Sequence, residues 1–261
     1  MKYQKQYDEK TREHILNAAR KEFAQWGFEG ARMANIAKTA NVNKALIHYY
    51  FTNKETLYEI ILRSIFIDDG ALDVPIISGK WDLTPPQKLY IMTYFIAKVN
   101  FQLANPDNFR ILAWEIAEGK THLQSTLDEE IYKRQKLFTR IITDGIENGD
   151  FDQDYPSWTI ISLFSLIIMY RNTSEFYEKM PGFVDIYKEH GIEELCGYIV
   201  RYVFKQVRPI NKPLDIPSVP DDLFKFINDI FKYLKEKKIQ SITGNVYSIV
   251  KNLLYPDDSE E

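Results

Sequence analysis

The sequence predicts an all-α protein. Apolar residues recur every three or four positions along most of the chain, strand-like alternation is scarce, and Gly and Pro stand mainly between the periodic runs. With 261 residues, of which 45% are hydrophobic, the chain can bury a sizeable core. We expect two helical domains followed by a C-terminal helical appendage.

The first predicted helix begins near Asp8 and ends at Gly27. Gly27 stands where a left-handed backbone would stop the helix. The apolar positions that define this helix recur at helical spacing and are Ile15, Leu16, Ala19, Phe23 and Trp26.

Residues 33–51 predict two short helices joined by a tight turn. Ala37 is small where the two helices cross, and Asn41 tolerates the left-handed backbone that the turn needs. Asn43 can accept hydrogen bonds from the free N–H groups of the second helix. The inward face of that helix is predicted to comprise Ile47, Tyr50 and Phe51. Such an element fits the major groove of DNA, although an ordinary helical hairpin has the same pattern.

A connecting helix follows. Thr52 and Glu55 have the spacing of a capping box, and an apolar run continues to about residue 68. The second helix of the motif would therefore lie between a supporting helix and an outgoing one. This arrangement predicts a small three-helix domain at residues 1–52 and a connecting helix at residues 53–68.

At this level the sequence resembles the TetR family of transcriptional regulators. The resemblance rests on the motifs at residues 11–16, 27–28, 36–37, 42–44 and 50–55, and it covers residues 8 to about 65. It implies a homodimer that binds a short palindromic operator in double-stranded DNA. It also implies that a small molecule entering the second domain releases the protein from DNA.

The resemblance assigns roles to positions in and around the second helix of the motif. Lys44, Ala45, Leu46 and His48 match positions that face the bases, and Tyr49, Tyr50 and Lys54 match phosphate contacts. We add Asn43 to the DNA-binding set.

Three departures from the family pattern matter. Asn41 replaces the usual Gly, which the left-handed turn tolerates. Arg32 replaces the usual Ser or Thr cap, whose loss costs about 1 kcal/mol, but its cation can reach a phosphate oxygen. We favour the phosphate role. Leu46 replaces a small polar residue and either contacts a thymine methyl group or packs on a neighbouring side chain.

The charge distribution agrees with a DNA-binding head. Residues 1–60 hold 10 Lys and Arg against 7 Asp and Glu, a net charge of +3, whereas the whole chain has −4.

The lone cysteine, Cys196, excludes an intrachain disulfide. The sequence has no signal-peptide pattern and no apolar run long enough to span a bilayer, so we expect a cytoplasmic protein with no membrane partner.

Residues 69–207 predict a second domain for ligand binding and dimerisation. After a loop, helices are expected at about 84–104, 107–118, 126–148, 156–173, 184–189 and 191–206. The helix at 156–173 is apolar on nearly every side and needs cover all round. We expect it to form a two-fold four-helix interface with the helix at 191–206, although burial of both inside one protomer is the alternative. The predicted interface residues are Trp158, Ile161, Leu166, Leu195, Ile199 and Tyr202.

The second domain is also rich in aromatic residues. Most belong to a core, but we expect Tyr94, Trp114 and Tyr132 to line an apolar cavity for a small apolar or amphipathic effector.

Residues 208–261 form a Pro-rich connector and an appendage. Apolar stripes at about 223–234 and 246–253 predict two helices, which we expect to pack back on the second domain.

The sequence offers no enzyme site. The four histidines are scattered, one cysteine cannot build a zinc site, and no glycine-rich phosphate loop appears. We therefore expect no catalytic residue, metal or cofactor. The predicted function is a ligand-responsive repressor that binds DNA, and the alternative is a ligand-sensing or interaction protein of the same fold that has lost operator binding.

Overall fold

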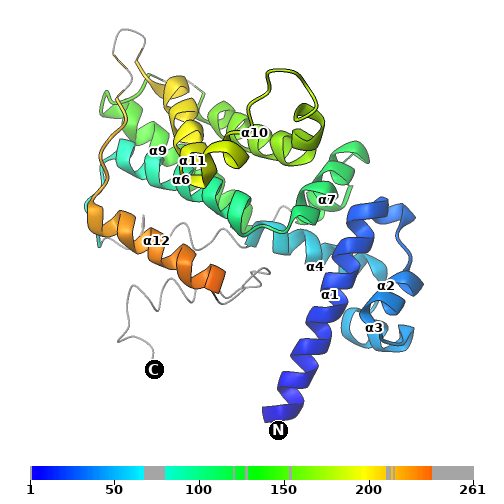
Figure 1. Ribbon diagram of the computed structural model, residues 1–261. Coiled ribbons are helices and arrows are strands. Elements are labelled where there is room, and N and C mark those ends of the chain that lie inside the picture. Colours follow the sequence, from blue (N-terminus) through cyan, green and yellow to red (C-terminus); the bar gives the residue numbers. More distant parts are fainter. Residues whose placement is uncertain are drawn as a thin grey trace. The chain divides into compact units, whose positions relative to one another are not determined.

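The structure, a computed structural model, describes residues 2–67, 80–119, 121–126, 129–152, 155–209, 213 and 215–236. Within these ranges the regular elements are helices and no strand is present, which confirms the all-α prediction (Figure 1). None of these helices has both the length and the apolar character required to traverse a bilayer. The described residues form two compact units.

The first unit contains the N-terminal helices and one helical pair from later in the chain. Its elements are α1 (Lys2–Gly30), α2 (Met33–Ala40), α3 (Lys44–Phe51), most of α4 (Lys54–Ile67), α7 (Pro106–Ala117) and α8 (Thr121–Thr126). Figure 1 shows α2 and α3 beside the long helix α1. The apolar faces of these helices meet in one core that includes Ile15, Phe23, Ile36, Ile47, Phe51, Leu57, Tyr58 and Ile111.

The end of α1 departs from the predicted pattern. Gly27 has a φ of +66°, as expected for a helix stop, but Trp26 does not lie in the core with the other apolar positions of this helix. Trp26 is 51% exposed, and Phe28 is buried beyond the break, with its ring centroid 5.1 Å from that of Tyr58. Phe28 follows the break, so the helical repeat before Gly27 does not predict its position.

The second unit is built around α6 (Pro85–Gln102). A capping box starts this helix, because Gln87 N–H donates to Thr84 Oγ1 and Thr84 N–H donates to Gln87 Oε1. The remaining elements are α9 (Glu129–Glu147), α10 (Pro156–Tyr177), α11 (Ile186–Val207) and α12 (Asp221–Glu236). The helix expected at 126–148 corresponds to α9, and the two expected at 184–206 form α11 with a break at Gly191, where φ is +85°.

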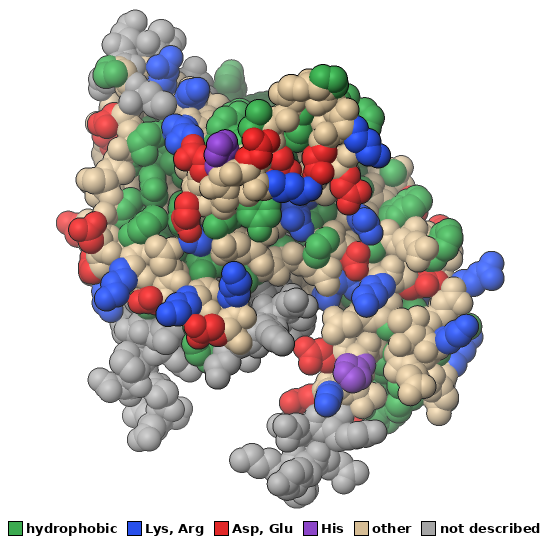
Figure 2. Space-filling view, viewed as in Figure 1, with side chains coloured by type: hydrophobic (Ala, Val, Ile, Leu, Met, Phe, Trp, Pro, Cys, Tyr) green, Lys and Arg blue, Asp and Glu red, His purple; other side chains and the backbone are tan. Residues whose placement is uncertain are grey.

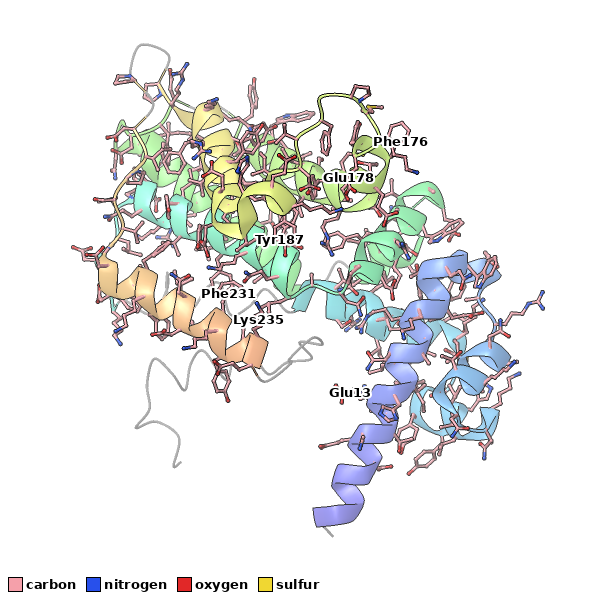
Figure 3. All side chains as sticks on the ribbon, in the orientation of Figure 1. Glu13, Phe176, Glu178, Tyr187, Phe231 and Lys235 are labelled. Atoms are coloured by element: carbon pink, nitrogen blue, oxygen red, sulfur yellow. The ribbon has the colours of Figure 1, made fainter. Side chains whose placement is uncertain are left out.

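Helix α12 packs against α6, as expected for the appendage. Its buried side chains are Leu223, Ile227, Ile230, Phe231 and Leu234. Figure 3 places Phe231 on the side of α12 that faces α6, where its ring centroid lies 5.0 Å from that of Phe95. The second appendage helix, expected at 246–253, lies outside the described residues.

A buried lysine joins α12 to two other helices. Lys98 of α6 is 4% exposed and donates hydrogen bonds to Tyr94 Oη at 3.0 Å, Glu193 Oε1 of α11 at 2.7 Å and Asn228 Oδ1 of α12 at 2.7 Å. Burial and the hydrogen bond to Glu193 raise the pKa of Tyr94, so its hydroxyl keeps the proton that it donates to that carboxylate. Burial disfavours the charged form of Glu193, but the hydrogen bonds from Lys98 and Tyr94 outweigh it and lower the pKa of Glu193.

The compact units differ from the expected domain boundaries in one respect. Residues 105–128 pack with the N-terminal helices, whereas we expected them within residues 69–207. The reason is the packing of α7 on α1, where Trp114 Nε1 donates to the carbonyl of Ala24 at 3.2 Å. The functional boundaries stay a prediction.

Replacement of Asn228 by Ala should lower the free energy of unfolding by about 1–2 kcal/mol, because the buried ammonium of Lys98 loses an acceptor. Urea unfolding of the full chain measures this loss. Asp229→Ala, at an exposed position on the same helix, is the control and should change stability by about 0.5 kcal/mol or less. Equal unfolding midpoints for the two variants would contradict the bridging role of Asn228.

Candidate nucleic-acid interface

The turn between α2 and α3 has the predicted geometry. Asn41 lies in the left-handed region with φ 54° and ψ 45°, and Val42 N–H donates to the carbonyl of Ala37 at 3.0 Å. Ala37 is buried between the helices. The short turn therefore fixes the direction in which α3 leaves α2.

Helix α3 begins at a side-chain cap and exposes one face. Asn43 Oδ1 accepts a hydrogen bond from Leu46 N–H at 2.7 Å, which confirms the predicted cap. Ile47 and Phe51 are buried. The opposite face carries four exposed side chains from the predicted DNA-binding set, namely Lys44, Ala45, His48 and Tyr49.

The two remaining positions on α3 are half-buried. Leu46 is partly covered, and the hydroxyl of Tyr50 donates to the carboxylate of Asp8 on α1. Tyr50 thus ties α3 to α1.

The link from α3 to α4 corrects the predicted capping box. Thr52 has a φ of +59°, and its N–H donates to the carbonyl of His48 at 3.0 Å, so Thr52 closes α3. Asn53 caps α4 instead, because its Oδ1 accepts from Thr56 N–H at 2.7 Å. His48 Nδ1 lies 2.7 Å from the carbonyl oxygen of Thr52 and donates to it.

Lys54 lies where α4 begins and contacts the end of α1. Its Nζ lies 4.6 Å from the ring centroid of Phe28 and donates to the carbonyl of Glu29 at 3.3 Å. A cation at a helix C-terminus interacts favourably with the carbonyl groups there. Lys54 therefore has a structural role, and its phosphate contact stays a prediction.

The start of α2 shows a feature that the sequence did not reveal. Arg32 has extended backbone and supplies no side-chain cap, as expected. Glu22 of α1 accepts hydrogen bonds at one oxygen, Oε1, from Arg32 N–H at 3.1 Å and from Asn35 Nδ2 at 2.9 Å. No local spacing rule signals an acceptor ten residues upstream on another helix.

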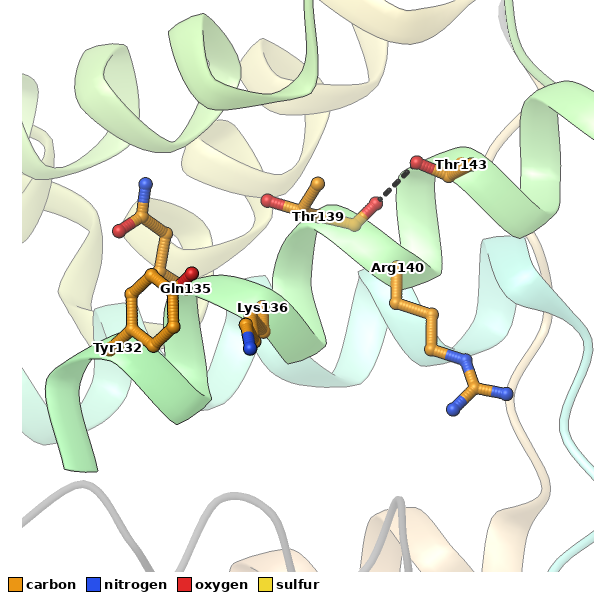
Figure 4. A pocket seen from close by; sticks show the side chains of 6 residues that line it. All are labelled: Tyr132, Gln135, Lys136, Thr139, Arg140 and Thr143. Atoms are coloured by element: carbon orange, nitrogen blue, oxygen red, sulfur yellow. Dashed lines mark hydrogen bonds between the residues drawn. The ribbon is translucent and has the colours of Figure 1, made fainter. Parts of the chain in front are cut away.

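The three residues expected to line a cavity lie in different surroundings. Tyr94 is buried beside Lys98 and Glu193, to which it is hydrogen-bonded. Trp114 packs over Gly27 in the first unit. Tyr132 is 57% exposed on α9, at an open depression of about 360 Å³ (Figure 4). The other residues that line it are Gln135, Lys136, Thr139, Arg140 and Thr143. The structure does not gather the three aromatic residues around one described cavity.

The expected dimer residues divide into two groups. Trp158 and Ile161 of α10 are 64% and 52% exposed, and Leu166 and Tyr202 are half-buried. Leu195 and Ile199 of α11 are buried inside the protomer, so they are not available to a second copy. Full burial of α10 in one protomer is also excluded, since its exposed apolar side chains continue to Met169 and Phe176, the latter labelled in Figure 3.

Charged side chains of both signs are interspersed on the face shown in Figure 2. The candidate interface is the exposed face of α3. A capped helix held by two supporting helices, with a lysine, a histidine and a tyrosine outward, has the arrangement of a helix-turn-helix motif.

Comparison with known proteins identifies the family. The sequence model for bacterial regulatory proteins of the tetR family matches residues 15–61. The HTH-type transcriptional repressor SCO4008 of Streptomyces coelicolor is 30% identical over 162 residues, which are 62% of this chain and 77% of that protein. The HTH-type transcriptional regulator RutR of Escherichia coli K12 is 25% identical over 198 residues, which are 75% of this chain and 89% of RutR.

A solved structure shows the same fold. The transcriptional regulator FadR of Bacillus subtilis, in complex with stearoyl-CoA, aligns with a TM-score of 0.54 and 17% identity over 76% of this chain and 100% of FadR. The chain belongs to the TetR family and is a DNA-binding transcriptional regulator.

Replacement of Asn43 by Ala should lower the free energy of unfolding by about 1 kcal/mol, because Leu46 N–H loses its acceptor. Urea unfolding measures the loss. Gln25→Ala, at an exposed position on α1, is the control and should leave stability within about 0.5 kcal/mol of the parent. If the two variants unfolded at the same urea concentration, the cap would not stabilise α3.

Proposed function

We propose that this regulator is a ligand-responsive repressor that binds a palindromic operator as a homodimer and is released by a small molecule. The observation that supports it best is the exposed face of α3, whose opposite face is anchored by Ile47 and Phe51. Its site of action is the bacterial cytoplasm, where an operator is accessible.

In this proposal α3 enters the major groove. Lys44, Ala45, Leu46 and His48 face the base edges, and Asn43 approaches the duplex from the N-terminal end of the helix. Four side chains around the helix contact phosphates and fix the position of α3 along the duplex. They are Arg32, Tyr49, Tyr50 and Lys54. Lys44 and Tyr49 are exposed and need no rearrangement to reach the duplex.

The proposed dimer surface is the exposed apolar face of α10. Trp158 and Ile161 lead this face, with support from Leu166 and from Tyr202 of α11. An interface related by a two-fold axis uses each residue twice, and it presents two reading helices to half-sites about one helical turn apart. A palindromic operator follows from that symmetry.

The proposed effector is a small apolar or amphipathic molecule. The complex of the structurally similar FadR with stearoyl-CoA supports this class, because that ligand joins an acyl chain to a polar carrier. Effector binding changes operator affinity by favouring one arrangement of the second domain, and α4 transmits this change to the helix-turn-helix formed by α2 and α3.

The direct test is capture of genomic DNA fragments by the purified full chain, followed by a screen for compounds that release them. The proposal expects a palindromic sequence among the captured fragments and release by an apolar or amphipathic compound. Failure to enrich any sequence at low salt would instead favour a protein of this fold that has lost operator binding.

Replacement of Lys44 by Ala should weaken operator binding at all salt concentrations. If Lys44 contacts a phosphate, the slope of log affinity against log salt should fall by about two units for a dimer, one unit per head. If Lys44 reads a base, discrimination at one operator position should relax with little change in slope. Fluorescence anisotropy across a salt series separates the two outcomes.

The control is Lys232→Ala, which removes the same charge from an exposed position on α12. Affinity for the operator should stay within about twofold of the parent. A Lys44→Ala variant that bound as tightly as this control would exclude Lys44 from the interface.

Replacement of Trp158 by Ala should raise the dissociation constant of the dimer by at least about tenfold, because the lost aromatic surface counts twice across a two-fold axis. Sedimentation velocity over a concentration series measures the shift. Ile116→Ala removes an exposed apolar side chain from α7 and is the control. Equal dissociation constants for both variants would place the dimer interface elsewhere.

A further inference from the structure

The start of α2 divides two tasks between two side chains. We propose that Glu22 is a positioning residue for DNA reading, because it fixes the start of α2 to α1 without using the side chain of Arg32, which can then contact a phosphate. This inference rests on the proposed operator binding, and it adds a residue from outside the helix-turn-helix motif.

The hydrogen bonds of Glu22 support the positioning role. A capping box needs an acceptor for the N–H of the residue that precedes the helix, and Glu22 Oε1 provides it for Arg32 at 3.1 Å. The same oxygen accepts from the side chain of Asn35 at 2.9 Å, within the first turn of α2. The carboxylate also lies at the N-terminal end of the helix, where a negative charge is favourable.

These bonds determine where α3 lies. Glu22 belongs to α1, and it fixes the N-terminus of α2 to that helix. The C-terminus of α2 is in turn joined to α3 by the short left-handed turn at Asn41. A shift at the start of α2 therefore moves α3 on the operator, although Glu22 itself contacts no base.

The side chain of Arg32 takes no part in capping α2. A Ser or Thr at this position would direct its hydroxyl inward to a backbone N–H of α2. Arg32 has no such bond, its side chain is exposed, and its backbone N–H is already satisfied by Glu22. Its guanidinium group is thus available to a phosphate beside the first turn of α2.

Three substitutions and one double variant test the proposal. Glu22→Gln keeps an acceptor oxygen and removes the charge, so operator affinity should equal or exceed that of the parent. Glu22→Ala also removes the charge but leaves no acceptor, and affinity should fall by about fivefold, the equivalent of one lost cap. The salt slope should be the same in both variants.

Arg32→Ser exchanges the cation for a local cap. Operator affinity should fall, and the salt slope should fall by about two units for the dimer. In the double variant Glu22→Ala with Arg32→Ser, the serine hydroxyl can accept only from an N–H inside the first turn of α2. It cannot replace the acceptor that Glu22 gives to the N–H of residue 32 and to Asn35 Nδ2, so the loss caused by Glu22→Ala should persist in the double variant.

Equal losses of operator affinity in Glu22→Gln and Glu22→Ala would overturn the proposal, as would a double variant that binds like Arg32→Ser alone. Amide hydrogen exchange of residues 32–36 without DNA gives an independent readout. Exchange should accelerate in Glu22→Ala and stay at the parental rate in Glu22→Gln. Unchanged exchange in Glu22→Ala would exclude the positioning role, whereas a parent that binds no DNA would contradict the proposed function alone.

Discussion

The burial of Ile47 and Phe51 in the core of the first unit is the interaction on which the presentation of α3 depends. Complete burial of such side chains stabilises by roughly 1.5–3 kcal/mol each, and both are at most 1% exposed. An eight-residue helix is too short to persist alone in water. Tertiary contacts therefore hold it, and burial of one face necessarily directs the opposite face, with Lys44 and Tyr49, toward solvent.

Interactions between neighbouring residues were enough to predict most of the helix-turn-helix correctly from the sequence. The turn at Asn41 and the cap at Asn43 depend only on neighbouring residues, so both were confirmed. Two features were missed at residues with positive φ: Thr52 closes α3 instead of capping α4, and Phe28 is buried beyond the break at Gly27. Trp26, which precedes that break, is exposed although its spacing matches the apolar positions of α1. Glu22 was missed because its partners lie on a different helix.

The second unit was harder to predict, since apolar character does not reveal which neighbour covers a residue. Leu195 and Ile199 have the spacing of an interface, yet both are buried inside the protomer. Tyr94 and Trp114 are equally aromatic, but one belongs to a buried polar cluster and the other packs on α1.

The hydrogen bonds of Lys98 also constrain when the second unit can finish folding during synthesis. Its ammonium group is shared by helices that are synthesised far apart in time, and Asn228 follows it by 130 positions. A nascent chain that has emerged only as far as α11 would expose this cation and the aromatic side chains around it. Completion of the second unit must therefore wait until α12 leaves the ribosome, so premature termination within the Pro-rich connector would yield a product prone to proteolysis.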